Sequence, residues 1–190
     1  ISPDLSGLSS IDGLSFYANE GAVIDLSQFT SYNGSSSRDT TIQAEGVGSS
    51  INLSGITTLT GGSGLQNLNL DAKAGGVVDL SNLTEITGGA TEVYAEGTDS
   101  VVNLASVASF VNDTIYDSFL SVREGGTIQA SQLTDLSNVD LYVRNGSSLD
   151  TAQITNLNDG SVTATGISPD LSGLSSIDGL SFYANEGAVI

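Results

Sequence analysis

Short strand-like segments recur along the whole chain, about every two dozen residues and always in the same order. Each unit contains an alternating pair such as Phe16/Ala18, then a glycine, then an apolar residue followed by Asp, Asn or Gln. Alternation places every second side chain on one face of a strand. The glycine allows the positive φ of a tight turn. Each unit is therefore predicted to hold two short strands joined by a turn.

Seven such units fill 166 residues when they are aligned on the apolar residue before the Asp, Asn or Gln. These anchor residues are Ile24, Ile51, Val78, Val102, Ile128, Leu149 and Pro169, of which Pro169 is the weak member. The alternating pairs are Phe16/Ala18, Ile42/Ala44, Leu70/Ala72, Val93/Ala95, Leu120/Val122, Leu141/Val143 and Val162/Ala164. The glycines are Gly21, Gly46, Gly75, Gly97, Gly125, Gly146 and Gly166. The same order in every unit indicates one repeated structural element.

Two further apolar columns lie five and eight positions after each anchor. The first is Phe29, Ile56, Leu83, Val107, Leu133, Ile154 and Leu174. The second is Tyr32, Leu59, Ile86, Phe110, Leu136, Leu157 and Ile177. A spacing of three residues between the two columns suits a bent segment that turns a corner.

The repeat predicts an all-β fold, a parallel β-helix or β-solenoid with about seven coils per 166 residues. A unit of this size cannot bury its inward face alone, but it can do so by stacking on copies of itself. Right-handed winding is the common outcome for parallel crossovers. A leucine-rich repeat is the alternative, because Leu80–Ile86 carries leucine spacing, but the Asn that closes that motif is missing. Strands and a glycine in every unit disfavour a helical repeat.

Residues 1–24 and 167–190 are identical. Residues 1–166 are therefore predicted to be one full tandem repeat, and residues 167–190 the start of the next, within a longer array. Parallel strands lie roughly 4.8 Å apart, so seven coils would advance the axis by about 34 Å.

Charge and composition exclude several classes of function. The chain has 4 Lys+Arg against 22 Asp+Glu, no His and no Cys, and its net charge is −18. Such a surface disfavours nucleic acid and anionic lipid, and the missing residue types exclude thiol nucleophiles, Ser-His-Asp triads and zinc fingers. No apolar run approaches the roughly 20 residues of a membrane span, so membrane insertion is not expected. Carboxylates are spread over repeating columns rather than paired in one place, and we therefore expect no enzyme activity.

Stacking brings acidic residues of neighbouring units together in two columns. After the anchors, Asp4 is expected beside Asp25, and Asp150 beside Asp170. A second column precedes the glycines, and its expected neighbours are Glu20 with Glu45 and Glu96 with Glu124. The negative charges of two such neighbouring carboxylates repel each other. Calcium, which prefers several oxygen ligands, could bridge them. The alternative is a solvated acidic face that keeps a fibre soluble.

Four consecutive units have long gaps before their next strand, at residues 32–42, 59–70, 86–93 and 110–120. These gaps are predicted to lie at one corner and to form a ridge, either as a contact surface or as neutral loop variation. Tyr32, Tyr94 and Tyr116 lie in or near it and are expected to be exposed.

Units such as Val78-Asp79-Leu80-Ser81-Asn82-Leu83-Thr84 resemble the parallel β-helix repeat regions of large bacterial cell-surface proteins, including adhesin and autotransporter stalks. The resemblance covers the whole chain. It implies an extracellular or cell-surface structural segment of a long fibre, sheath or adhesin stalk. Its implied partners are adjacent repeats of the same chain, neighbouring fibres and polysaccharide. The alternative function is a β-helix domain that binds or degrades polysaccharide.

Overall fold

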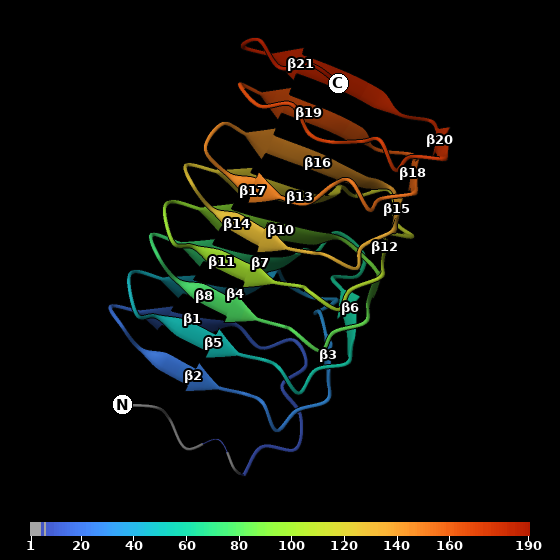
Figure 1. The fold of residues 1–190 in the computed structure, drawn as a ribbon. Helices are drawn as coiled ribbons and strands as arrows, with labels where there is room; N and C mark the ends of the chain where they lie inside the picture. The colour runs from blue at the N-terminus through green and yellow to red at the C-terminus, as the bar shows by residue number, and fades with distance from the viewer. Residues whose placement is uncertain (1–4, 6) are drawn as a thin grey trace.

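The computed structural model describes residues 5 and 7–190, and it is a stack of parallel β-coils with three walls (Figure 1). Sheet A consists of β1 (Phe16–Asn19), β4 (Thr40–Glu45), β7 (Leu68–Lys73), β10 (Thr91–Glu96), β13 (Ser118–Arg123), β16 (Val139–Arg144), β19 (Ser161–Thr165) and β21 (Ser181–Asn185). Sheet B consists of β2 (Val23–Asp25), β5 (Ser50–Asn52), β8 (Val77–Asp79), β11 (Val101–Asn103), β14 (Thr127–Gln129) and β17 (Ser148–Leu149). Sheet C consists of β3 (Ser31–Asn33), β6 (Thr58–Gly61), β9 (Glu85–Gly88), β12 (Ser109–Val111), β15 (Asp135–Ser137), β18 (Asn156–Asn158) and β20 (Ser176–Asp178).

The strand order confirms the predicted all-β parallel solenoid. In each sheet, every strand between the two end strands pairs with the strand one coil before and one coil after it, and all of these pairings are parallel. The described residues include no helix, and hence none that is long and apolar enough to cross a membrane.

The strand register confirms the predicted columns. Ile24 lies opposite Ile51 in sheet B, and Val78 lies opposite Val102. In sheet C, Phe110 lies opposite Leu136. The apolar columns of the strands are therefore ladders of side chains along the axis, and in sheet B the ladder extends from β2 to β17.

The core is the inside of this tube, filled by the aliphatic residues of the ladders. Ile42, Leu70 and Val93 from sheet A are 0 % exposed, as are Ile51 and Val78 from sheet B. Burial of this apolar surface favours folding by roughly 25 cal/mol per Å². No coil can bury its residues without its neighbours, so the stack is held together along its axis.

The corners follow the expected turn chemistry. The apolar residue five positions after the anchor is buried at a bend, where Ile56 N donates to Leu53 O at 2.9 Å and Leu83 N to Leu80 O at 3.0 Å. At the opposite corner, Gly46 has a φ of 93°, in the left-handed region that glycine tolerates best. The glycine column is therefore a column of turns.

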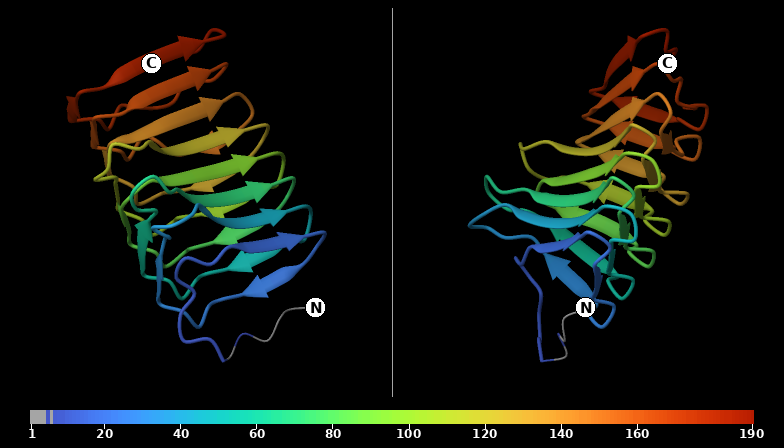
Figure 2. Two further views of the ribbon diagram at one scale, coloured as in Figure 1. Left: turned by 180° about the vertical axis from the view of Figure 1, so that it is seen from behind. Right: turned by 90° about the vertical axis from the view of Figure 1, so that its left-hand side faces the viewer.

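The four long gaps lie between sheet C and sheet A, and their loops project beyond the wall in the right-hand view of Figure 2. Leu65 and Ile115 lie in these loops and are 69 % and 90 % exposed. The expectation that Tyr32 is exposed was wrong. Tyr32 is an inward residue of β3, is 1 % exposed, and its hydroxyl donates to Leu14 O at 2.9 Å. Tyr94 and Tyr116 are half-buried.

Candidate functional site

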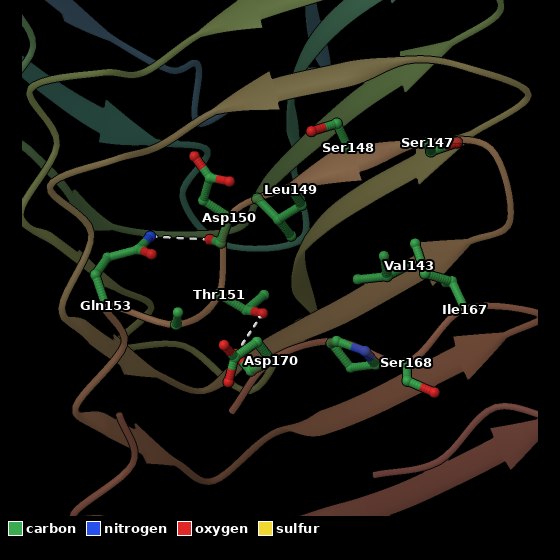
Figure 3. A pocket seen from close by; sticks show the side chains of 12 residues that line it. Val143, Ser147, Ser148, Leu149, Asp150, Thr151, Gln153, Ile167, Ser168 and Asp170 are labelled. Carbon is green, nitrogen blue, oxygen red and sulfur yellow. Dashed lines mark hydrogen bonds between the residues drawn. The ribbon is translucent and has the colours of Figure 1, made fainter. Parts of the chain in front are cut away.

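Sheet B stops at β17, whereas sheets A and C continue for another coil. Pro169 occupies the position where the next strand of sheet B is expected, and proline has no N–H to donate to a neighbouring strand. A recess of about 370 Å³ opens beside β17 at this point (Figure 3). We call it the Pro169 recess. It is lined by Val143, Ser147, Ser148, Leu149, Asp150, Thr151, Ala152, Gln153, Ile167, Ser168, Pro169 and Asp170.

Hydrogen bonds hold the two acidic residues of the Pro169 recess in place. Thr151 Oγ1 donates to Asp170 O at 2.7 Å, and Gln153 Nε2 donates to Asp150 O at 2.9 Å. Figure 3 shows the two carboxyl groups on either side of Thr151. The Asp170 carboxylate also accepts a bond from Ser172 N at 2.9 Å, and the hydrogen bonds from Ser172 lower the pKa of Asp170. Apolar side chains, among them Val143 and Leu149, thus line the recess together with the acidic Asp150 and Asp170.

The Asp and Asn residues after the anchors cap the turn that follows sheet B. Asp25 Oδ1 accepts a bond from Ser27 N at 3.0 Å, and Asp79 Oδ1 accepts one from Ser81 N at 3.0 Å. Hydrogen bonds from the side chain and the backbone of Ser27 lower the pKa of Asp25. A carboxylate that accepts the N–H two residues ahead is a common turn device. The spacing Asp-x-Ser is the sequence signal that identifies this turn-capping role. The calcium hypothesis did not take this signal into account.

Amide side chains separate these carboxylates along the axis. Asn52 Nδ2 donates to Asp25 Oδ1 at 3.1 Å, and Asn103 Nδ2 donates to Asp79 Oδ1 at 3.1 Å. The neighbour of Asp25 in the next coil is therefore an amide. Asp4, its expected acidic neighbour, lies outside the described residues.

The acidic column before the glycines has a different register from the expected one. Glu45 lies opposite Asn19, and Glu96 lies opposite Arg123, whose Nη2 is 2.6 Å from Glu96 Oε2. Glu20 and Glu124 follow the ends of their strands and have a φ of 55° each. Glu20 and Glu45 nonetheless line one shallow hollow, and Glu96 and Glu124 line another. Calcium binding stays a prediction, and in the described part of the chain no three acidic residues are grouped closely enough to hold a metal ion.

The outer face of sheet A carries a row of aromatic rings. Tyr94 and Phe119 pack edge to face with centroids 4.8 Å apart, and Phe119 and Tyr142 do the same at 5.8 Å. The guanidinium of Arg123 lies 5.7 Å from the centre of the Tyr94 ring. Such contacts contribute roughly 0.5–1.5 kcal/mol each beyond the burial of area. The row therefore stabilises the stacking of three successive coils through contacts on the outer surface.

Charged residues that are buried or half-buried lie beside this row. The Asp71 side chain is 8 % exposed, and Lys73 Nζ lies 2.7 Å from its Oδ2. Burial raises the pKa of Asp71, and the bond to Lys73 opposes that effect. Burial, and then the charge of Asp71, raises the pKa of Glu92. Burial, and then a hydrogen bond to Asp140, raises the pKa of Tyr142 to about 12.

No family model, curated protein or solved structure matches this chain. The ladders of sheets A, B and C extend over successive coils, and their polar residues mostly bond to one another or to turns. The arrangement is therefore suited to stabilising a stack, and at the Pro169 recess the ladder of sheet B is interrupted.

Proposed function

We propose that this chain is a structural segment of a long extracellular or cell-surface fibre, sheath or adhesin stalk. In such a fibre the coils continue from one 166-residue repeat into the next. Adjacent repeats of the same protein are then its main partners. The resemblance of the coil pattern to bacterial cell-surface repeats supports the proposed location.

One observation carries the proposal: the two identical segments, which lie at opposite ends of one stack, have matching turns and matching strands in sheet A, β1 and β21. Gly13 and Gly179 both have a φ of 64°, and Gly21 and Gly187 have φ values of 80° and 79°. The turns at these glycines thus have the same form at both ends of the stack. A chain that continued after residue 190 with the sequence that follows residue 24 could repeat the same stacking.

The burial of matching residues supports continuation along the axis. Ile11 is 0 % exposed beneath the coil that follows it, whereas the identical Ile177 is 58 % exposed. A following coil of the same sequence would cover Ile177 as the present one covers Ile11. Apolar surface at the end of a stack therefore favours further stacking.

The test is the length of proteins that contain one, two and three copies of residues 1–166, each closed by the 24-residue segment. We expect rods of constant width whose maximum dimension grows by about 34 Å per added copy, since seven coils are each about 4.8 Å high. Small-angle X-ray scattering and electron microscopy measure both quantities. Globular particles, or copies that fold as separate beads, would contradict the proposal.

A further inference from the structure

The single lysine of the chain lies between a carboxylate and a carboxamide on the outer face of sheet A. Lys73 Nζ lies 2.7 Å from Asp71 Oδ2 and donates to Gln43 Oε1 at 3.2 Å. Gln43 belongs to β4, whereas Asp71 and Lys73 belong to β7, the neighbouring strand one coil further along. A primary amine, a side-chain amide and a buried acid are thus held in contact across two coils.

The carboxamide of Gln43 is held at both of its ends. Its Oε1 accepts the bond from Lys73, and its Nε2 donates to Glu45 Oε2 at 2.9 Å. These two contacts determine which end of the amide is the oxygen, because an ammonium group only donates and a carboxylate only accepts. The carboxamide carbon, Cδ, is therefore one bond away from an atom that Lys73 already contacts.

Asp71 is not fully hydrogen-bonded, although it is only 6 % exposed. Its Oδ2 contacts Lys73, whereas its Oδ1 is buried and has no hydrogen-bond partner among the described residues. A buried polar atom without a partner is costly and calls for an explanation. A proton taken from Lys73 would convert the buried carboxylate to a neutral acid and would leave Lys73 as a free amine. Burial raises the pKa of Asp71, which favours this transfer.

We propose that Lys73 and Gln43 form a covalent isopeptide bond with each other, and that Asp71 transfers the protons of the reaction. The nucleophile, the amide and the acid all belong to this chain, so residues 1–166 would contain one such crosslink. The inference goes beyond the proposed function, because the bond forms within one chain whether or not the repeats build a fibre.

The reaction exchanges one amide for another. Asp71 accepts a proton from the ammonium group of Lys73, and the resulting amine attacks Cδ of Gln43. The bond from Nζ to Cδ forms, and the bond from Cδ to Nε2 breaks when Asp71 gives its proton to Nε2, which leaves as ammonia. Nζ loses its second proton to that ammonia, so that ammonium is released. No electrons are gained or lost.

Proximity favours the attack, since effective molarities of well-oriented groups reach about 10⁵–10⁸ M. The escape of ammonia into water then prevents the reverse reaction. Neighbouring coils lack the required set of groups. The strand register places Glu96 opposite Lys73, and Arg123 opposite Glu96. A guanidinium stays protonated in proteins and cannot replace the amine as a nucleophile. The crosslink is therefore specific to β4 and β7.

The bond would join two successive coils covalently. Gln43 and Lys73 are 30 positions apart, so the crosslink closes a loop of that length. It restricts the unfolded chain as a disulfide does, and we expect it to raise Tm by about 10 °C. In a fibre under tension, the two coils could not separate completely while this bond remained intact.

Mass spectrometry of the intact folded chain is the test. We expect a mass lower than that of the sequence by one ammonia molecule, and the difference should persist after unfolding in urea. Trypsin then locates the bond, because it cleaves after Lys73 only when the amine is free. Cleavage after Arg38 and Arg123 should proceed, whereas residues 39–123 should stay together and carry the missing mass.

Four variants separate the roles of the groups, and circular dichroism checks that each one folds. Lys73→Arg keeps the positive charge but has no amine, so it should retain its full mass. Gln43→Met should do the same. Gln129→Met is the matched control, because Gln129 is exposed on β14 of sheet B, and it should still lose ammonia. Asp71→Asn should slow the loss by about 100-fold or more, since it removes the proton transfer.

A folded chain that has its full mass and is cleaved normally after Lys73 would overturn the crosslink. A loss of ammonia that persists in Lys73→Arg would also overturn it, because the loss would then arise at another residue. Neither result affects the proposed function, which the length of the tandem rods tests. A crosslinked chain whose tandem copies form no rod would remove the proposed function and leave the crosslink.

Discussion

The first copy, residues 7–24, and the second copy, residues 173–190, share a sequence and the conformation of their turns but differ in which face is covered. Glu20 and Glu186 adopt nearly the same left-handed φ, 55° and 52°, although neither is glycine. Burial, by contrast, changes in both directions. The following coil covers Ile11 completely, whereas the equivalent Ile177 is 58 % exposed. Leu14 changes in the opposite direction: it is 37 % exposed in the first copy, and the equivalent Leu180 is half-buried in the second.

This difference separates two kinds of information in the sequence. The conformation of a turn is a local property that survives a change of neighbours. The burial of a side chain depends on which coil lies beside it. Paired substitutions at equivalent positions therefore measure the contribution of the neighbouring coil with the local sequence held constant.

The largest difference is expected for Ile11→Asp against Ile177→Asp. A carboxylate at Ile11 has no access to water, and we expect the free energy of unfolding to fall by about 3–5 kcal/mol. At Ile177, which is 58 % exposed, the fall should be about 1 kcal/mol or less. Urea denaturation at low protein concentration, followed by circular dichroism, measures both values. Equal losses would show that the following coil contributes little to burial.

A smaller difference is expected for Ala18→Leu against Ala184→Leu. Ala18 lies opposite Ala44 inside the tube and is 0 % exposed, so the larger side chain overpacks the core at a cost of about 1–3 kcal/mol. Ala184 is exposed at the end of the stack and should accept leucine with little change. Thermal unfolding should show a fall of several degrees in Tm for the first variant alone. Similar Tm values would mean that the tube accommodates the extra volume.

A third pair, Asp12→Ala and Asp178→Ala, tests one hydrogen-bonded contact. The Asp12 carboxylate accepts bonds from Asn33 N at 2.8 Å and from Asn33 Nδ2 at 3.2 Å. Its loss should lower stability by about 1 kcal/mol, whereas the loss of Asp178 should have almost no effect. Hydrogen exchange at the Asn33 amide is the measurement. Faster exchange is expected in Asp12→Ala only, and an unchanged rate there would show that water replaces the carboxylate.

No difference is expected between Gly21→Ala and Gly187→Ala. The two glycines have φ values of 80° and 79°, and a Cβ at Gly21 would meet nothing closer than Val47 O at 3.7 Å. Each substitution should therefore lower the free energy of unfolding by roughly 1–2 kcal/mol, through backbone strain alone. Equilibrium denaturation of both variants tests this equality. A much larger loss at Gly21 would show that the following coil also constrains the turn.

The register of the three sheets could be predicted from the sequence because an inward column has a simple signature. Side chains alternate with a period of two, so an apolar residue, its small partner and a nearby glycine determine which residues face inward. Pro169 was also recognisable as the weak anchor residue, although the size of the recess depends on how far the neighbouring chain departs from β17.

The outer contacts could not be predicted in the same way. Two residues separate Ala18 from its glycine, Gly21, whereas only one separates Ala44 from Gly46. Alignment on the glycine therefore placed Glu20 beside Glu45, although the strand register pairs Glu45 with Asn19. The aromatic row was missed for another reason. Tyr94, Phe119 and Tyr142 lie on three strands far apart in sequence, and no single unit contains the pattern.

The interruption of sheet B at Pro169 has a mechanical consequence for the proposed fibre. Over most of the repeat, three hydrogen-bonded walls resist bending, whereas at this level only sheets A and C are continuous. A rod loses stiffness where one of its walls is cut, and it bends most easily in the plane that opens or closes the cut. An array of these repeats would therefore have a compliant joint about every 34 Å, always on the same side of the unit. Its flexibility would be periodic and directional rather than uniform.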